Sequence, residues 1–151
     1  MASEIERLQQ VIDSAIGGSV TAKSDGTTHD IFPIAIHPRE GEALSDWVAR
    51  EGAASSIEIG FGYGVSTLFV FRGLLSNGSS APFRHLTIDP NQIQGFASIG
   101  LSWLRKLACA IISTSTTIGR NSSFPAYWPR NVNSTSRSWT AITASTGYSS
   151  T

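Results

Sequence analysis

The feature that most constrains the fold is a short apolar strand that runs directly into three closely spaced glycines. Residues 55–60 read SSIEIG and predict a buried strand, and Gly60, Gly62 and Gly64 then occupy alternate positions. Because glycine has no Cβ, the backbone can bend sharply there and approach a ligand closely. A helix predicted over 65–75 and a strand over 83–89 complete a βαβ unit, the kernel of a doubly wound α/β sheet.

Amphipathic helices are predicted on both sides of this unit. Ser3 and Glu6 form a capping-box pattern that begins the first helix, and Pro38 suits the first turn of a second helix that ends near Gly52. Residues 31–36 are expected to be extended, and residues 92–107 to form a further helix. The residues expected on the buried faces of these helices are Ile5, Leu8, Val11, Ile12, Ala15, Ile16, Leu44, Trp47, Val48, Phe96, Ile99, Trp103 and Leu107.

Polar side chains stand at the ends of the two predicted strands. Glu58 lies near the end of the first predicted strand, and Asp89 ends the second. A carboxylate has two oxygens, so Asp89 can accept both hydroxyl protons of a cis-diol. Ser66 can either contact a cofactor or cap the helix. The competing interpretation is a structural turn in which Asp89 caps the next helix.

The strand, glycine loop, helix, strand and terminal Asp, in that order, resemble motif I of class I S-adenosylmethionine-dependent methyltransferases, in particular small O-methyltransferase-like proteins. The resemblance covers residues 30–107 and is best over 55–90. It implies a Rossmann-like sheet, S-adenosyl-L-methionine as cofactor, and methyl transfer to a small-molecule acceptor such as an oxygen. The cofactor-binding residues that it implies are Glu58, Gly60, Gly62, Gly64, Ser66 and Asp89. Glu58 would lie near the charged end of the cofactor or order the loop.

Two other classes of function stay open. A nicotinamide oxidoreductase would carry a glycine three positions after the second one, and that position holds Val65. A non-catalytic interaction module would have a stable core that ignores both cofactors. The methyl acceptor and the oligomeric state are left open.

The last third of the chain departs from the composition of a folded domain. All eleven acidic residues lie within residues 4–89, and eighteen of the residues in 111–151 are Ser or Thr. Such a composition is typical of disorder. We therefore expect a partial methyl-donor-binding domain over 1–107 and an irregular Ser/Thr-rich tail over 108–151.

The tail also suggests a shifted reading frame. When the third base of each codon is read with the first two bases of the next, TCN serine codons become apolar codons and ACN threonine codons become polar ones. One permitted reading of 124–151 is LPRLLAEERQFDLAFVDGNHRFDGVFLD, in which Trp139 and Thr140 force an Asp. Its FDLAFVDGNH segment resembles the fourth-strand motif of the methyltransferase family. We therefore hypothesise a single-nucleotide slip between about Arg105 and Thr116, and an impaired enzyme.

Composition disfavours several other partners. The net charge is zero and the basic residues beyond residue 90 are scattered, so nucleic-acid binding is not expected. Cys109 is the only cysteine, which excludes an intrachain disulfide. His29, His37 and His85 lack metal-ligand spacing, so we predict no metal site. The absence of a long apolar run predicts a cytoplasmic protein without membrane contact.

Overall fold

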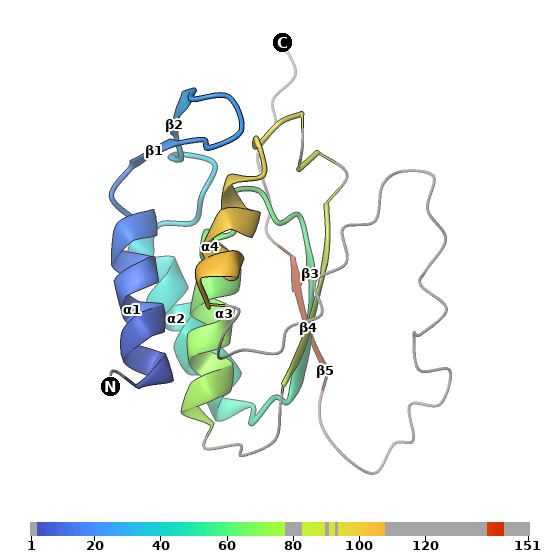
Figure 1. The fold of residues 1–151 in the computed structure, drawn as a ribbon. Coiled ribbons are helices and arrows are strands. Elements are labelled where there is room, and N and C mark those ends of the chain that lie inside the picture. The colour runs from blue at the N-terminus through green and yellow to red at the C-terminus, as the bar shows by residue number, and fades with distance from the viewer. Residues whose placement is uncertain (1–2, 78–82, 90, 93, 108–138, 144–151) are drawn as a thin grey trace.

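The structure of the chain is a computed structural model that describes residues 3–77, 83–89, 91–92, 94–107 and, for the backbone, 139–143. It contains four helices in these residues, with five strands placed between and after them (Figure 1). The helices are α1 (Glu4–Ala15), α2 (Pro38–Arg50), α3 (Val65–Ser76) and α4 (Ile99–Leu107), and the strands are β1 (Ser19–Thr21), β2 (Thr28–Asp30), β3 (Ser55–Ile59), β4 (Arg84–Ile88) and β5 (Trp139–Thr143).

The βαβ unit predicted from the sequence is confirmed. Strand β3 pairs with β4 in parallel, with Ile57 opposite Leu86, and α3 connects the two strands. Strand β5 pairs in parallel with the other edge of β3, so β3 is the central strand of a three-stranded sheet. All four helices lie on one side of this sheet in Figure 1. The architecture is therefore an α/β, Rossmann-like layer of helices on a parallel sheet.

The two faces of β3 differ in burial. Ser56 and Glu58 are fully buried on the helix side, whereas Ile59 on the alternate face is 54% exposed. Successive strand residues point to opposite faces, so the described helices cover one face of the sheet only. The apolar core lies between the helices and this covered face.

Glycines allow α2 and α3 to pack closely against each other. A Cβ added to Gly41 on α2 would lie 2.3 Å from the Phe69 ring of α3. A Cβ added to Gly73 on α3 would lie 2.5 Å from the Ser45 carbonyl oxygen of α2. Both glycines are therefore required by the short distance between the helices, and this contact forms the centre of the helical layer.

A single arginine joins the three N-terminal helices. Arg72 on α3 donates to Ser45 Oγ and Glu42 on α2 and to Gln9 Oε1 on α1, the last at 3.2 Å. Its guanidinium also stacks over the Phe69 ring, 5.0 Å from the centroid. The planar guanidinium offers five donors, which suits one side chain contacting three elements.

The helix boundaries were partly predicted. The capping box of Ser3 and Glu6 is confirmed, and α2 begins at Pro38 with a second capping box formed by His37 and Glu40. Two predicted core residues are wrong, because Ile5 and Trp47 are 41% and 42% exposed. Each lies at the edge of its helix's apolar stripe, where helical spacing alone does not separate the buried from the exposed side.

Two segments differ from the sequence prediction. Residues 31–36, expected to be extended, form a turn that follows an unpredicted hairpin, β1 with β2. The last helix begins at Ile99 and not near residue 92, because Gln92 bonds back to the glycine loop and Ala97 and Ser98 have positive φ angles of 47° and 54°. Such angles are incompatible with a right-handed helix.

The predicted tail lies almost wholly outside the described residues. Its described part, Trp139–Thr143, is strand β5, whereas an irregular segment was expected there. The side chains of this stretch do not alternate between apolar and polar, so the sequence does not predict a strand there. The strand depends on backbone pairing with β3.

We expect Gly73→Ala to lower the free energy of unfolding by about 1–3 kcal/mol, the usual penalty of overpacking. The added methyl would collide with Ser45 and Val48 of α2. Urea unfolding followed by circular dichroism measures the change. The control is Gly17→Ala, whose added Cβ meets only the Ser14 oxygen at 3.5 Å. Equal urea midpoints for the two variants would contradict the close packing of α2 and α3.

Candidate functional site at the glycine loop

The loop between β3 and α3 needs its three glycines. Gly60, Gly62 and Gly64 have φ angles of 87°, 53° and 76°, in the left-handed region that favours glycine. Gly64 is also the N-cap of α3, and a Cβ there would lie 2.8 Å from the Phe61 ring. The N-cap makes no side-chain hydrogen bond to the first turn of α3. The positive end of the α3 dipole is therefore free of a side-chain cap.

Glu58 lies beneath the loop and not in it. Its carboxylate is fully buried and accepts from the Ser66 hydroxyl at 2.5 Å and from the Thr67 hydroxyl. Both donors belong to the first turn of α3. The structure therefore joins Glu58 to the first turn of α3, directly after the loop.

His85 lies next to this carboxylate, although its Nε2 forms no hydrogen bond with any described residue. It lies on β4, is 1% exposed, and places Nε2 at 3.3 Å from Glu58 Oε2. Its Nδ1 lies 2.8 Å from Ser56 Oγ on β3, and its ring meets Phe71 of α3 edge-on. A buried polar network thus joins β3, β4 and α3 directly under the glycine loop.

Asp89 is bound to the loop from the other side. Its Oδ2 accepts from the Gly62 amide at 2.7 Å and from Gln92 Nε2 at 2.9 Å, and its Oδ1 accepts from the Asn91 amide. Gln92 Nε2 also donates to the Gly62 carbonyl at 2.8 Å. Asp89 is 3% exposed. Asp89 therefore holds the loop and keeps its remaining acceptor capacity on Oδ1.

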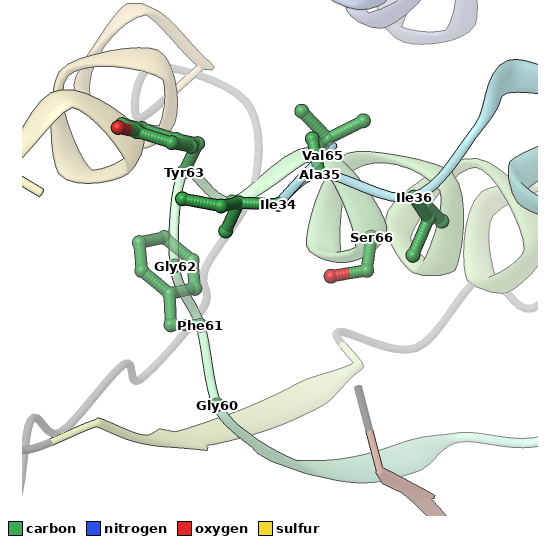
Figure 2. A pocket seen from close by; sticks show the side chains of 10 residues that line it. Ile34, Ala35, Ile36, Gly60, Phe61, Gly62, Tyr63, Val65 and Ser66 are labelled. Carbon is green, nitrogen blue, oxygen red and sulfur yellow. The ribbon is translucent and has the colours of Figure 1, made fainter. Parts of the chain in front are cut away.

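A pocket lies between residues 34–36 and residues 60–66 (Figure 2). It is open to solvent, and its empty space, with the solvent at its mouth included, is about 260 Å³. The residues that line it are Ile34, Ala35, Ile36, Gly60, Phe61, Gly62, Tyr63, Gly64, Val65 and Ser66. None of these lining residues is charged. The pocket is thus an apolar cleft whose polar groups are loop backbone and the Ser66 hydroxyl.

The structure brings most of the predicted site residues together. Gly60, Gly62, Gly64 and Ser66 line the pocket, whereas Glu58 and Asp89 support the loop from outside it. The expectation that Ser66 caps α3 is wrong, because its hydroxyl proton goes to Glu58 and Gly64 occupies the cap. The competing interpretation of Asp89 as a cap of the next helix also fails, since α4 begins only at Ile99.

Sequence reasoning missed three residues that shape this site. Gln92 donates to the loop, and His85 lies beside the Glu58 carboxylate. Tyr63 is a residue of the loop itself and lines the pocket. A signal existed only for His85, whose position in an otherwise apolar strand marks a buried polar group that needs a partner. Gln92 falls at the start of the helix predicted over 92–107, and nothing in the local sequence distinguishes Tyr63 from other loop residues.

Two expected absences can be examined within the described residues. In these ranges no cluster of three His, Cys, Asp or Glu side chains has the arrangement of a metal site. None of the helices described has the length and apolar character required of a membrane span.

Comparison with known proteins gives similarity in structure only. No family model matches the chain, and a search of curated proteins returned no match. The O-methyltransferase from Bacillus cereus in complex with SAH is 23% identical, with a TM-score of 0.47 over 78% of this chain and 44% of that one. The O-methyltransferase TomG from Streptomyces achromogenes, in complex with SAM, is 19% identical, with a TM-score of 0.47 over 80% and 44%.

The chain thus spans less than half the length of these neighbours. Both of these proteins are named as O-methyltransferases. Scores of this size leave any inference about function to the geometry of the site.

We expect Thr67→Val to lower the free energy of unfolding by about 1.5–3 kcal/mol, the range for a hydrogen bond to a charged group. The substitution keeps the shape of the side chain and removes one of the two hydroxyls that solvate buried Glu58. Urea unfolding measures the loss. Thr28→Val is the control, since Thr28 bonds only to Thr21 in an exposed pair. A loss no larger than in the control would show that Glu58 does not depend on Thr67.

Proposed function

We propose that this chain carries the methyl-donor half of a class I S-adenosylmethionine-dependent methyltransferase and binds S-adenosyl-L-methionine at the glycine loop. The observation that carries the proposal is the uncharged pocket between residues 34–36 and the loop, placed at the uncapped N-terminus of α3. A donor with a zwitterionic methionine end and no phosphate suits such a pocket.

The methionine end of the donor fits the α3 side of the pocket. The free first-turn amides of α3 can donate to the carboxylate of the methionine, where the helix dipole also favours negative charge. The Ser66 hydroxyl donates its one hydrogen bond to Glu58, so toward a bound molecule it can serve only as an acceptor. An ammonium group is the complementary donor. Ser66 and α3 together therefore match both charges of an amino acid.

The ribose end fits the residues that follow β4. Asp89 Oδ1 accepts one amide and retains lone pairs, and Gln92 Oε1 is buried without a hydrogen-bond partner among the described residues. A buried acceptor without a donor is unfavourable, and a hydroxyl would satisfy it. Because Asp89 is 3% exposed, we infer that the loop moves slightly on binding.

When bound, the cofactor would supply a methyl group on a positively charged sulfonium. The contribution of this chain would be to position that group, because a methyl transfer is accelerated mainly by holding the reactants in line. The pocket lined by Ile34, Ile36 and Phe61 would exclude water from the donor. The carboxylates of Glu58 and Asp89 make the surroundings of the loop favourable for a cation and unfavourable for a pyrophosphate.

The same features argue against a nicotinamide oxidoreductase. Val65, at the position where that fingerprint has its third glycine, is 2% exposed and packs in the apolar core. No lysine or arginine lines the pocket in the part of the chain that is described. A purely structural interaction module would have no need for a loop of three left-handed glycines beside an apolar cleft.

We further propose that methyl transfer by this chain is weak or absent. The acceptor side and any strand-four acid would be encoded beyond about residue 107, in the segment that we interpret as out of frame. The shifted FDLAFVDGNH reading spans codons 133–143, which include those of β5. The proposed small-molecule acceptor would therefore have no complete binding site.

Isothermal titration of the full chain with S-adenosylhomocysteine tests donor binding, with NADH as the comparison. We expect S-adenosylhomocysteine to bind and NADH not to bind. Asp89→Asn should weaken binding about 10- to 100-fold, because hydrogen bonds to a charged group contribute about 1.5–3 kcal/mol. Asp46→Asn is the control, an exposed carboxylate on α2. Tighter binding of NADH, or equal affinity of both variants, contradicts the proposal.

Sequencing the encoding DNA tests the shifted frame. We expect the neighbouring frame to be open from a point between about residues 105 and 116 and to continue past the present end. A chain restored to that frame should transfer methyl groups from S-adenosylmethionine at a rate well above that of the present chain. Stop codons throughout the neighbouring frame would refute the shift and leave the donor-site proposal untouched.

A further inference from the structure

Tyr63 connects the glycine loop to the N-terminal hairpin. Among residues 60–64 it alone has a polar side chain. Its ring points away from the pocket that its backbone helps to line (Figure 2), and it is 6% exposed. The ring packs edge-on against Phe96, and its hydroxyl lies 3.3 Å from Nδ1 of His29 on β2. The loop is thus attached to a part of the chain that is remote in sequence.

His29 continues a chain of hydrogen bonds along the hairpin. Its Nε2 lies 2.8 Å from Thr27 Oγ1, and Thr27 Oγ1 donates to Asp25 Oδ1 at 2.7 Å. The Thr27 hydroxyl and amide hold the pKa of Asp25 below its ordinary value. Asp25 therefore ends the chain as a charged acceptor.

The direction of these bonds follows from the single proton of the Thr27 hydroxyl. That proton goes to Asp25, so Thr27 accepts from the Nε2–H of His29. In a neutral imidazole Nδ1 is then the acceptor and receives the proton of the Tyr63 hydroxyl. Burial, aided by the charge of Asp30, raises the pKa of Tyr63, so this hydroxyl keeps its proton. Donors and acceptors therefore match at each hydrogen bond from Tyr63 to Asp25.

We propose that His29 is a positioning residue for the glycine loop and acts through Tyr63; the inference rests on the proposed role of that loop in binding the methyl donor. Three left-handed glycines give the loop more conformational freedom than other sequences have. Ordering such a loop on binding opposes affinity, and a side chain that holds it beforehand reduces that loss. The hairpin of β1 and β2 supplies this hold from outside the pocket.

Two variants test the contact in the full chain. Tyr63→Phe removes the hydroxyl, and His29→Phe removes both ring nitrogens while it keeps a ring beside Tyr63. We expect amide hydrogen exchange of residues 62–66, measured without cofactor, to be about three- to tenfold faster in both. S-adenosylhomocysteine should bind about three- to tenfold more weakly, the size expected for one neutral hydrogen bond. The double variant should lose no more than either single variant.

Nitrogen NMR of His29 gives a readout that a merely structural role would not change. We expect the Nε2–H tautomer in the unsubstituted chain and a shifted Nδ1 resonance in Tyr63→Phe. Thr21→Val, an exposed substitution on β1, is the control and should leave loop exchange unchanged.

The possible results separate the two proposals. Unchanged loop exchange in both variants, or additive losses in the double variant, would overturn the role of His29. Faster loop exchange in both variants supports it. If the unsubstituted chain fails to bind S-adenosylhomocysteine while loop exchange responds as expected, the methyl-donor function is overturned and the positioning of the loop by His29 stands.

Discussion

The buried carboxylate of Glu58 is the interaction on which the rest of this structure depends. A buried carboxylate is tolerated only when donors replace its water, and here the hydroxyls of Ser66 and Thr67 on α3 do so, with His85 of β4 next to them. Satisfying Glu58 therefore fixes where α3 begins relative to the ends of β3 and β4. The connecting chain has only five residues, 60–64, to reach that position. It does so through three left-handed glycines. The acidic strand end and the alternating glycines are thus parts of one device.

How much of this could be predicted depends on how local each interaction is. The βαβ unit and the capping box of Ser3 and Glu6 follow from residues close in sequence, and both were predicted. The hairpin of β1 and β2 and the start of α4 were not, because they depend on contacts between distant residues. Gln92, for example, leaves its predicted helix because its amide bonds to Gly62, thirty residues earlier. Helical periodicity contains no information about such a contact.

The same distinction applies to the candidate site. The sequence identified the glycines and both carboxylates by position, but it could not divide them by role. Gly60, Gly62, Gly64 and Ser66 line the pocket, whereas Glu58 and Asp89 act on the loop from beneath and beside it. Ser66 shows how contacts change a prediction. Its hydroxyl donates its one hydrogen bond to Glu58, so toward any bound molecule it is an acceptor. That restriction favours an ammonium over a carboxylate as its partner.

The proposed donor site depends on contacts within a limited part of the chain. The hydrogen bonds and ring contacts described for the loop come from residues 29–100, and the helices that bury this region pack on one face of the sheet. The opposite face, where Ile59 is 54% exposed, has no such support from the described helices. The proposed donor site and the proposed loss of methyl transfer therefore concern different parts of the chain, so that one proposal can hold without the other.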